Sequence, residues 1–235
     1  MIERTPKNSA KRHDNADCAA LDSLILSECR TARLLVLDDK GLLFAQGSAA
    51  DAAFLILDGF AKVSHIAEDG TEITIDLLKP GDIAGTLSQS PQSCLVHEEQ
   101  ARAVGPLAVR RMESAGLFRA MQGNARLSLL LAGYLAKSRQ AVQRRSLRAL
   151  TQPVSRRVAE TLVDLARTFG VPCPHGFSLE IKLTQQDIAD LVGASRSVVS
   201  TILNDLRSRG LLDYTRDMIC VNDSALALSA DQTQA

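Results

Sequence analysis

The 235-residue sequence has no tryptophan, only two tyrosines, and an aromatic content of 3%. A platform of stacked aromatic rings, as used by many single-strand nucleic-acid binders, is therefore not expected. Long apolar runs are missing too, since no stretch approaches the roughly 18 consecutive apolar residues that span a bilayer. The charged N-terminus lacks the apolar core of a secretory signal. These absences predict a cytoplasmic protein with no membrane partner.

Patterns of catalysis are also missing. The sequence contains no Gly-x-Ser-x-Gly, no glycine-rich phosphate loop with lysine and no His-Glu-x-x-His, and its four histidines are dispersed. We therefore predict that the protein is not an enzyme and assign no catalytic and no metal-binding residues. The five cysteines should mostly be free thiols in a reducing compartment. They are scattered along the chain at Cys18, Cys29, Cys94, Cys173 and Cys220.

The zero net charge conceals a strong asymmetry. Between Asp38 and Glu99 stand eleven acids and three bases, whereas Ala115 to Arg157 holds nine bases and no acid. Such a basic block attracts a polyanion, but it is as often a solvated face or the partner of an acidic segment in the same chain. Charge alone leaves these interpretations open.

The front half of the chain carries the signals of a β domain. Residues 1–17 are polar and expected to be loose, and residues 18–37 fit one or two short helices. Residues 41–112 contain short strand-like runs separated by turns such as Asp58-Gly59. Glycine accepts positive φ, so Asp-Gly favours a hairpin, and evenly spaced short strands favour an antiparallel sandwich or barrel. We predict a β domain over residues 18–115.

A long helix is predicted next, over residues 116–150. Its stretch from Leu127 to Ala149 would span about 35 Å and has an apolar stripe that needs a covering partner. A second copy of the chain is our preferred partner, and packing within the same chain is the alternative. Pro153 marks a break and a hinge. The predicted dimer interface consists of Leu127, Leu131, Tyr134, Ser138 and Ala141.

The segment from Leu183 to Leu206 has the pattern of a helix-turn-helix. Thr184 can cap the first helix, with Asp187 three residues later as a near capping box. Gly193 suits a left-handed exit from that helix, and Ser195 can cap the second helix. The second helix should bury its apolar side chains, which are Val198, Val199, Ile202, Leu203 and Leu206.

The outward side of this motif is predicted to bind DNA, because short polar groups and an arginine suit hydrogen bonds with base edges and phosphates. Downstream, Gly210–Val221 reads as a two-stranded wing, and residues 169–176 read as a loop. The mildly acidic balance from Lys182 onward counts slightly against DNA, but the preceding basic block would supply a positive field. The predicted DNA-binding residues of this 151–235 domain are Thr184, Gln185, Ser195, Arg196, Ser197, Ser200 and Thr201.

With this motif and the segment Lys79-Pro-Gly-Asp-Ile-Ala-Gly85, the sequence resembles the family of the cyclic-AMP receptor protein and the FNR-type regulators, over residues 42–230. The resemblance implies an α+β fold with an N-terminal antiparallel β-roll of the cupin-like, cyclic-nucleotide-binding type. A long dimerisation helix and a C-terminal winged helix-turn-helix would follow. It also implies a bacterial homodimeric transcription regulator, controlled allosterically through its β-roll, that binds palindromic double-stranded DNA and contacts RNA polymerase.

Carried over by position, Arg196 matches the arginine that the cyclic-AMP group uses on guanine, while Ser197 and Thr201 replace a Glu and an Arg. A different DNA sequence should therefore be read. The effector site departs further, because His97-Glu98-Glu99 stands where that group has Arg-Ser-Ala. A phosphate clamp needs a positive fork, so cyclic AMP is not the expected effector. The candidate effector-pocket residues are Gly85, Thr86, Leu87, His97, Tyr134 and Gln143.

Other effectors stay open. An FNR-type iron–sulfur cluster needs three clustered N-terminal thiolates, and here only Cys18 and Cys29 lie there. Cys94 and His97 could bind haem, and Cys173 is the candidate for a redox thiol. Effector and cofactor therefore remain unassigned. The alternative for the whole chain is a β-roll sensor or interaction module, haem- or redox-responsive, that acts through protein partners instead of DNA.

Overall fold

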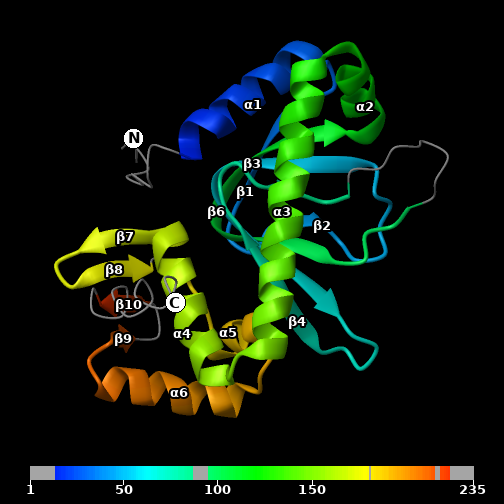
Figure 1. Ribbon diagram of the computed structural model, residues 1–235. Coiled ribbons are helices and arrows are strands. Elements are labelled where there is room, and N and C mark those ends of the chain that lie inside the picture. The colour runs from blue at the N-terminus through cyan, green and yellow to red at the C-terminus, as the bar shows by residue number, and fades with distance from the viewer. Residues whose placement is uncertain (1–13, 87–94, 180, 215–217, 223–235) are drawn as a thin grey trace, which may run out of the picture.

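The computed structural model describes residues 14–86, 95–179, 181–214 and 218–222. Figure 1 shows an N-terminal β-roll, a long helix beside it and a C-terminal unit of helices around a small sheet. This is the predicted α+β architecture. The apolar core divides into a cluster within the β-roll, a second beneath its flanking helices, and a third in the C-terminal unit that also includes Leu77 of the β-roll. No helix in these described ranges is both long and apolar enough to cross a membrane.

The β-roll is an antiparallel sheet with the strand order β1-β6-β3-β4, in which β2 also pairs with β6 and β5 with β3. A helix, α1 (Asp14–Glu28), precedes it. The prediction of helices throughout residues 18–37 is wrong in its second half, because residues 33–37 pair with β6 as a strand. The strands are β1 (Arg33–Leu37), β2 (Leu42–Phe44), β3 (Ala52–Ile66), β4 (Glu72–Leu78), β5 (Ile83–Ala84) and β6 (Gln100–Glu113).

Asp58-Gly59 is not the hairpin turn that we predicted. β3 runs through it as one strand, and its pairing with β6 shifts register on both sides of Asp58. Gly59 has φ 79°, and a Cβ there would lie 2.1 Å from the carbonyl oxygen of Pro106. The glycine therefore bends a continuous strand where the neighbouring backbone comes close, instead of reversing the chain.

Two helices follow where one was predicted. α2 (Ser114–Gly123) ends before Asn124, whose side chain accepts a hydrogen bond from the Leu127 amide and caps α3 (Ala125–Thr151). α3 runs along the whole β-roll in Figure 1, with α1 against its N-terminal half. It ends just before Pro153, as predicted, and α4 (Val154–Phe169) begins directly afterwards.

The C-terminal unit packs three helices against a four-stranded antiparallel sheet with the order β7-β8-β10-β9. Residues 170–173 and 176–179 form strands of this sheet, so the loop predicted over 169–176 is reduced to a tight turn. The predicted wing is present as β9 and β10. The elements after α4 are β7 (Gly170–Cys173), β8 (Gly176–Leu179), α5 (Gln185–Val192), α6 (Arg196–Ser208), β9 (Leu212–Tyr214) and β10 (Ile219–Asn222).

Candidate nucleic-acid interface

Helices α5 and α6 form the helix-turn-helix, and local chemistry fixes their ends. The Thr184 hydroxyl accepts a hydrogen bond from the Asp187 amide, and the Asp187 carboxylate accepts one from the Thr184 amide, which closes the predicted capping box. Gly193 ends α5 in the left-handed conformation with φ 65°. The Ser195 hydroxyl accepts a hydrogen bond from the Val198 amide and caps α6. The turn is therefore built as the sequence predicts.

The α6 helix buries one face and presents the other to solvent. Val199 and Leu203 are buried, whereas Arg196, Ser197 and Thr201 are exposed. Val198 was expected to point inward, but its side chain is 43% exposed. It follows the helix's first, solvent-facing residues and therefore lies at the edge of the outward face.

This outward face can bind an anionic, hydrogen-bonding ligand. Hydroxyl groups and one guanidinium lie at the start of α6, where the free amides and the helix dipole also favour negative charge. Two other predicted DNA-binding side chains, Ser200 and Gln185, are less accessible to a ligand. Ser200 is half-buried, and the Gln185 amide lies 3.5 Å from the Tyr214 hydroxyl of β9. Phosphate and base contacts are thus available along one edge of the motif.

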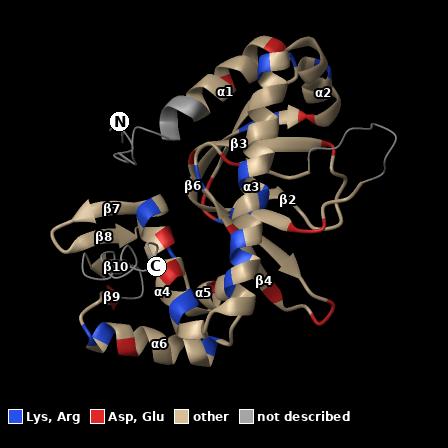
Figure 2. Ribbon diagram, in the orientation of Figure 1, with Lys and Arg blue, Asp and Glu red and all other residues tan. Residues whose placement is uncertain are grey.

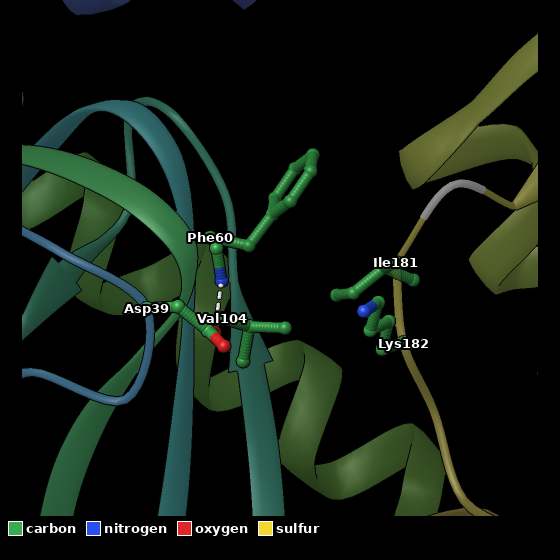
Figure 3. A pocket seen from close by; sticks show the side chains of 6 residues that line it. Asp39, Phe60, Val104, Ile181 and Lys182 are labelled. Atoms are coloured by element: carbon green, nitrogen blue, oxygen red, sulfur yellow. Dashed lines mark hydrogen bonds between the residues drawn. The ribbon is translucent and has the colours of Figure 1, made fainter. Parts of the chain in front are cut away.

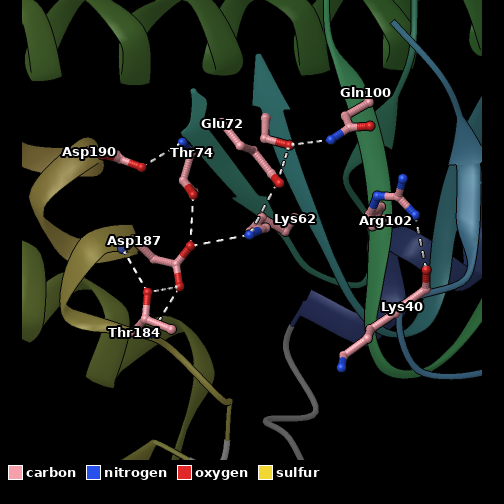
Figure 4. A network of polar contacts seen from close by, with 10 residues as sticks. Lys40, Lys62, Glu72, Thr74, Gln100, Arg102, Thr184, Asp187 and Asp190 are labelled. Atoms are coloured by element: carbon pink, nitrogen blue, oxygen red, sulfur yellow. Dashed lines mark hydrogen bonds and ion pairs between the residues drawn. The ribbon is translucent and has the colours of Figure 1, made fainter. Parts of the chain in front are cut away.

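The helix-turn-helix is joined to the β-roll by a polar network that the sequence did not reveal (Figure 4). Thr74 of β4 donates its hydroxyl proton to an Asp187 carboxylate oxygen at 2.8 Å, and its amide donates to Asp190 at 2.9 Å. Lys62 of β3 forms an ion pair with the same Asp187 oxygen at 3.3 Å. We call Lys62, Thr74, Asp187 and Asp190 the α5–β4 contact. It holds the first helix of the motif against the β-roll.

Asp187 is buried, and burial alone would raise its pKa. Hydrogen bonds from Thr184 and Thr74, together with the Lys62 ammonium, outweigh that effect and hold the pKa of Asp187 below its ordinary value. The carboxylate is therefore ionised at neutral pH and keeps all of these partners.

The basic block is partly neutralised within the chain. Figure 2 shows Lys and Arg along α3, facing acidic residues on α4 and β4. Arg145 pairs with Asp76 at 2.9 Å, and Arg148 pairs with Glu160 at 3.0 Å and with Asp164 at 2.6 Å. Intramolecular pairing, one of the three interpretations of the charge pattern, therefore accounts for part of the block.

An apolar contact and a pocket lie beside the α5–β4 contact. The rings of Phe60 on β3 and Phe169 on α4 meet edge to face, with centroids 5.1 Å apart. A pocket of about 280 Å³ opens between the β-roll and the segment that leads into α5 (Figure 3). Its lining residues are Asp39, Phe60, Val104, Gly105, Ile181 and Lys182.

Three of the predicted effector-pocket residues lie together in the β-roll. His97 is buried, stacks on Phe44 with ring centroids 3.9 Å apart, and lies so near Gly85 that a Cβ there would be 3.2 Å from the imidazole. Burial lowers the pKa of His97, so the ring is neutral at pH 7. Its Nδ1 has no hydrogen-bond partner among the described residues. Thr86 follows Gly85 directly, and Leu87 lies outside the described residues.

The other two candidates lie on α3 and do not join this group. The Tyr134 hydroxyl accepts a hydrogen bond from the Ile83 amide at 2.9 Å and donates one to the Ile83 carbonyl at 3.1 Å. Burial raises the pKa of Tyr134 to about 12, so the phenol stays neutral. Gln143 is exposed further along the helix. Tyr134 therefore attaches α3 to β5.

Two of the predicted dimer-interface residues must be corrected. Leu127 and Leu131 are 0% exposed and pack against α1 and the sheet of their own chain. Ser138 and Ala141 are exposed. The large apolar side chains that α3 leaves in solvent are Leu129, Leu130, Leu135, Val142, Leu147 and Leu150.

The cysteines lie in two kinds of surroundings. Cys18 on α1 and Cys29 directly after it are buried, and the Cys18 thiol donates to the Ile56 carbonyl. Cys173, His175 and Cys220 come together in the C-terminal sheet, with ligand atoms all within 4.8 Å of one another. Cys173 was predicted alone, as a candidate redox thiol, because 47 residues separate it from Cys220. Cys94, the proposed haem ligand, lies outside the described residues.

Two protein-family models match the chain, one over the β-roll and one over the C-terminal unit. Residues 34–124 match the cyclic nucleotide-binding domain family, and residues 156–227 match the Crp-like helix-turn-helix domain family. The global nitrogen regulator of Synechocystis is 29% identical over 196 residues, 83% of this chain and 87% of that protein. The cAMP-activated global transcriptional regulator CRP of Salmonella typhimurium is 29% identical over 178 residues, 74% of this chain and 81% of that protein.

A solved structure shows the same fold. The c-di-GMP responsive global regulator CLP of Xanthomonas campestris superimposes with a TM-score of 0.72 at 20% identity, over 87% of this chain and 99% of that chain. The two relatives and the CLP regulator are named for different regulatory roles. None of the three names therefore assigns an effector to this chain.

Proposed function

Because the chain belongs to the CRP/FNR family of DNA-binding transcription regulators, we propose that it acts as a homodimer on a palindromic operator. The observation that carries this proposal is the outward face of α6, where Arg196, Ser197 and Thr201 are exposed at a capped helix start. Two copies would place these faces in successive major grooves, about one helical turn of DNA apart. Contact with RNA polymerase would convert binding into a change in transcription.

We further propose that an effector controls this activity by moving the helix-turn-helix relative to the β-roll. The α5–β4 contact supports this, because DNA-bound motifs place their first helix across the DNA backbone. Here the carboxylates of Asp187 and Asp190 on that helix are engaged by β3 and β4. An effector acts allosterically only if it binds the two arrangements with different affinity.

The effector is proposed to be something other than a cyclic nucleotide. His97 is neutral and buried, and Glu98 and Glu99 follow it, so this segment offers carboxylates where a phosphate requires a cation. An absorption spectrum of anaerobically purified protein separates the remaining classes. A Soret band would indicate haem, and a broad charge-transfer shoulder would indicate an iron–sulfur cluster.

The DNA-binding proposal is tested by selecting duplexes from a random pool with the full-length protein and then titrating the selected site. Arg196→Ala should cost about 1–3 kcal/mol of binding free energy and relax the preference at one base position. The matched control is Arg33→Ala, which removes the same charge from an exposed position on β1. It should leave both affinity and base preference unchanged.

Two outcomes would count against the proposal. Unchanged affinity and preference in Arg196→Ala would remove α6 from its assigned role. Failure to enrich any duplex, at low salt where phosphate contacts are strongest, would favour the alternative of an interaction module that acts through protein partners.

A further inference from the structure

The sheet of the C-terminal unit brings two thiols and an imidazole together. Cys173 ends β7, His175 lies in the two-residue turn between β7 and β8, and Cys220 lies on β10. The two sulfur atoms are 3.4 Å apart, and the possible ligand atoms of all three residues lie within 4.8 Å of one another. None of the three belongs to the proposed DNA-reading face or to the β-roll.

The strand pairing explains how distant residues meet here. β8 lies between β7 and β10, and its positions opposite Cys173 and Cys220 are Gly176 and Ser178. Both belong to the same face of β8, because side chains two residues apart on a strand point the same way. One position has no side chain and the other a small one. The two thiols can therefore approach each other across the middle strand.

We propose that Cys173, His175 and Cys220 form a binding site for a thiophilic divalent cation of the zinc class. Two thiolates on one tetrahedral zinc, with Zn–S bonds of about 2.3 Å, lie about 3.8 Å apart, close to the 3.4 Å present here. Two sulfurs and one imidazole nitrogen form a donor set that binds zinc in preference to magnesium or calcium. His175 is exposed, so the fourth position is open to water.

Such an ion would connect the two hairpins of the sheet to the C-terminal end of α6. It would join the β7–β8 turn to β10 by bonds additional to the β8–β10 ladder. Two residues after Cys220, the Asn222 amide donates to the Leu211 carbonyl at 3.0 Å, and its side chain donates to the Gly210 carbonyl. These bonds attach β10 to the turn that follows α6. The cation is therefore expected to rigidify the wing and the C-terminal end of α6.

The test is a Co²⁺ titration of reduced, chelator-treated full-length protein. We expect one equivalent per chain, with sulfur-to-cobalt charge-transfer absorption and the intense visible bands of tetrahedral cobalt, and displacement of both by Zn²⁺. Cys173→Ser and Cys220→Ser should each abolish these bands. Loss of a residue that only hydrogen-bonds to a metal ligand typically weakens metal binding by about 10–100-fold. His175→Asn removes a ligand itself and should weaken Co²⁺ binding by at least that factor. Cys29→Ser, a buried cysteine beside α1, is the matched control and should bind normally.

Absence of tetrahedral bands in folded wild-type protein would overturn the proposal, as would bands that persist in Cys173→Ser and Cys220→Ser. If those variants fail to fold, alkylation of the wild-type protein decides instead. Zn²⁺ should protect Cys173 and Cys220 from N-ethylmaleimide, as read by peptide mass spectrometry, and a chelator should restore labelling. Equal labelling with and without Zn²⁺ would refute the site.

Discussion

Asp187 shows how one side chain can serve both a helix and a domain contact. Asp187 lies three residues after Thr184, and the hydrogen bonds between them follow from the local capping pattern, so the sequence predicts them. Its links to Lys62 and Thr74 cross more than a hundred residues and depend on how two units pack. A single sequence contains no local signal for that packing. The capping role was therefore predictable and the α5–β4 contact was not.

Thr74→Val tests whether the α5–β4 contact restrains the DNA-binding unit. The valine keeps the size and the backbone amide that binds Asp190, and Asp187 retains Lys62, so the loss is one hydroxyl donor. A hydrogen bond to a charged group is worth about 1.5–3 kcal/mol. We therefore expect effector-free protein to bind its operator more tightly, by about tenfold or more, in a fluorescence-anisotropy titration.

The control for this variant is Thr71→Val, in the exposed turn of the same hairpin, which should leave affinity unchanged. Equal or weaker binding by Thr74→Val would mean that the contact does not oppose DNA binding. The pKa of Asp187 lies below its ordinary value of 3.8, so the contact persists above that value and is lost only as the pH falls below it. The difference between wild type and Thr74→Val should thus be constant from about pH 6 to pH 8.

At the scale of elements, the sequence predicted best where local chemistry decides. The ends of α5 and α6 follow from Thr184, Gly193 and Ser195, and all three act as predicted. Gly59 shows the opposite case. Asp-Gly suits a hairpin turn, but this glycine is required because the Pro106 carbonyl lies beside it. The same dipeptide fits a bend within a strand, and only the tertiary neighbour distinguishes the two.

Gly193→Ala measures what the turn of the helix-turn-helix requires. The added Cβ would meet its nearest atom, Arg157 Nη1, at an ordinary 3.7 Å, so the cost comes from the left-handed backbone. That cost is about 1–2 kcal/mol for a residue with a Cβ. We expect a lower Tm and weaker DNA binding, measured by thermal unfolding and operator titration. Gly123→Ala, at the end of α2 with open space around it, should leave stability unchanged or slightly raised.

At the scale of the whole molecule, the apolar stripe of α3 was predictable but its partner was not. The N-terminal part of the stripe, Leu127 and Leu131, covers the chain's own core with α1. Hydrophobic periodicity predicts that one face of a helix is buried, but it does not identify the surface that covers this face. Further along, Leu135 and Val142 are 49% and 55% exposed and lie seven residues apart, as on a coiled-coil seam. The proposed dimer interface therefore moves towards the C-terminal half of α3.

Replacing Leu135 and Val142 together with Glu should convert the dimer to a monomer of 25.3 kDa, because two like charges per chain would face each other across the seam. Light scattering coupled to size-exclusion chromatography measures the mass. The matched control replaces Leu129 and Leu147 with Glu; their side chains are 74% and 60% exposed. Five turns separate these two, so they share another face of α3. A dimer that survives the first pair and not the second would place the interface on that other face, and a monomeric wild type would exclude α3 pairing altogether.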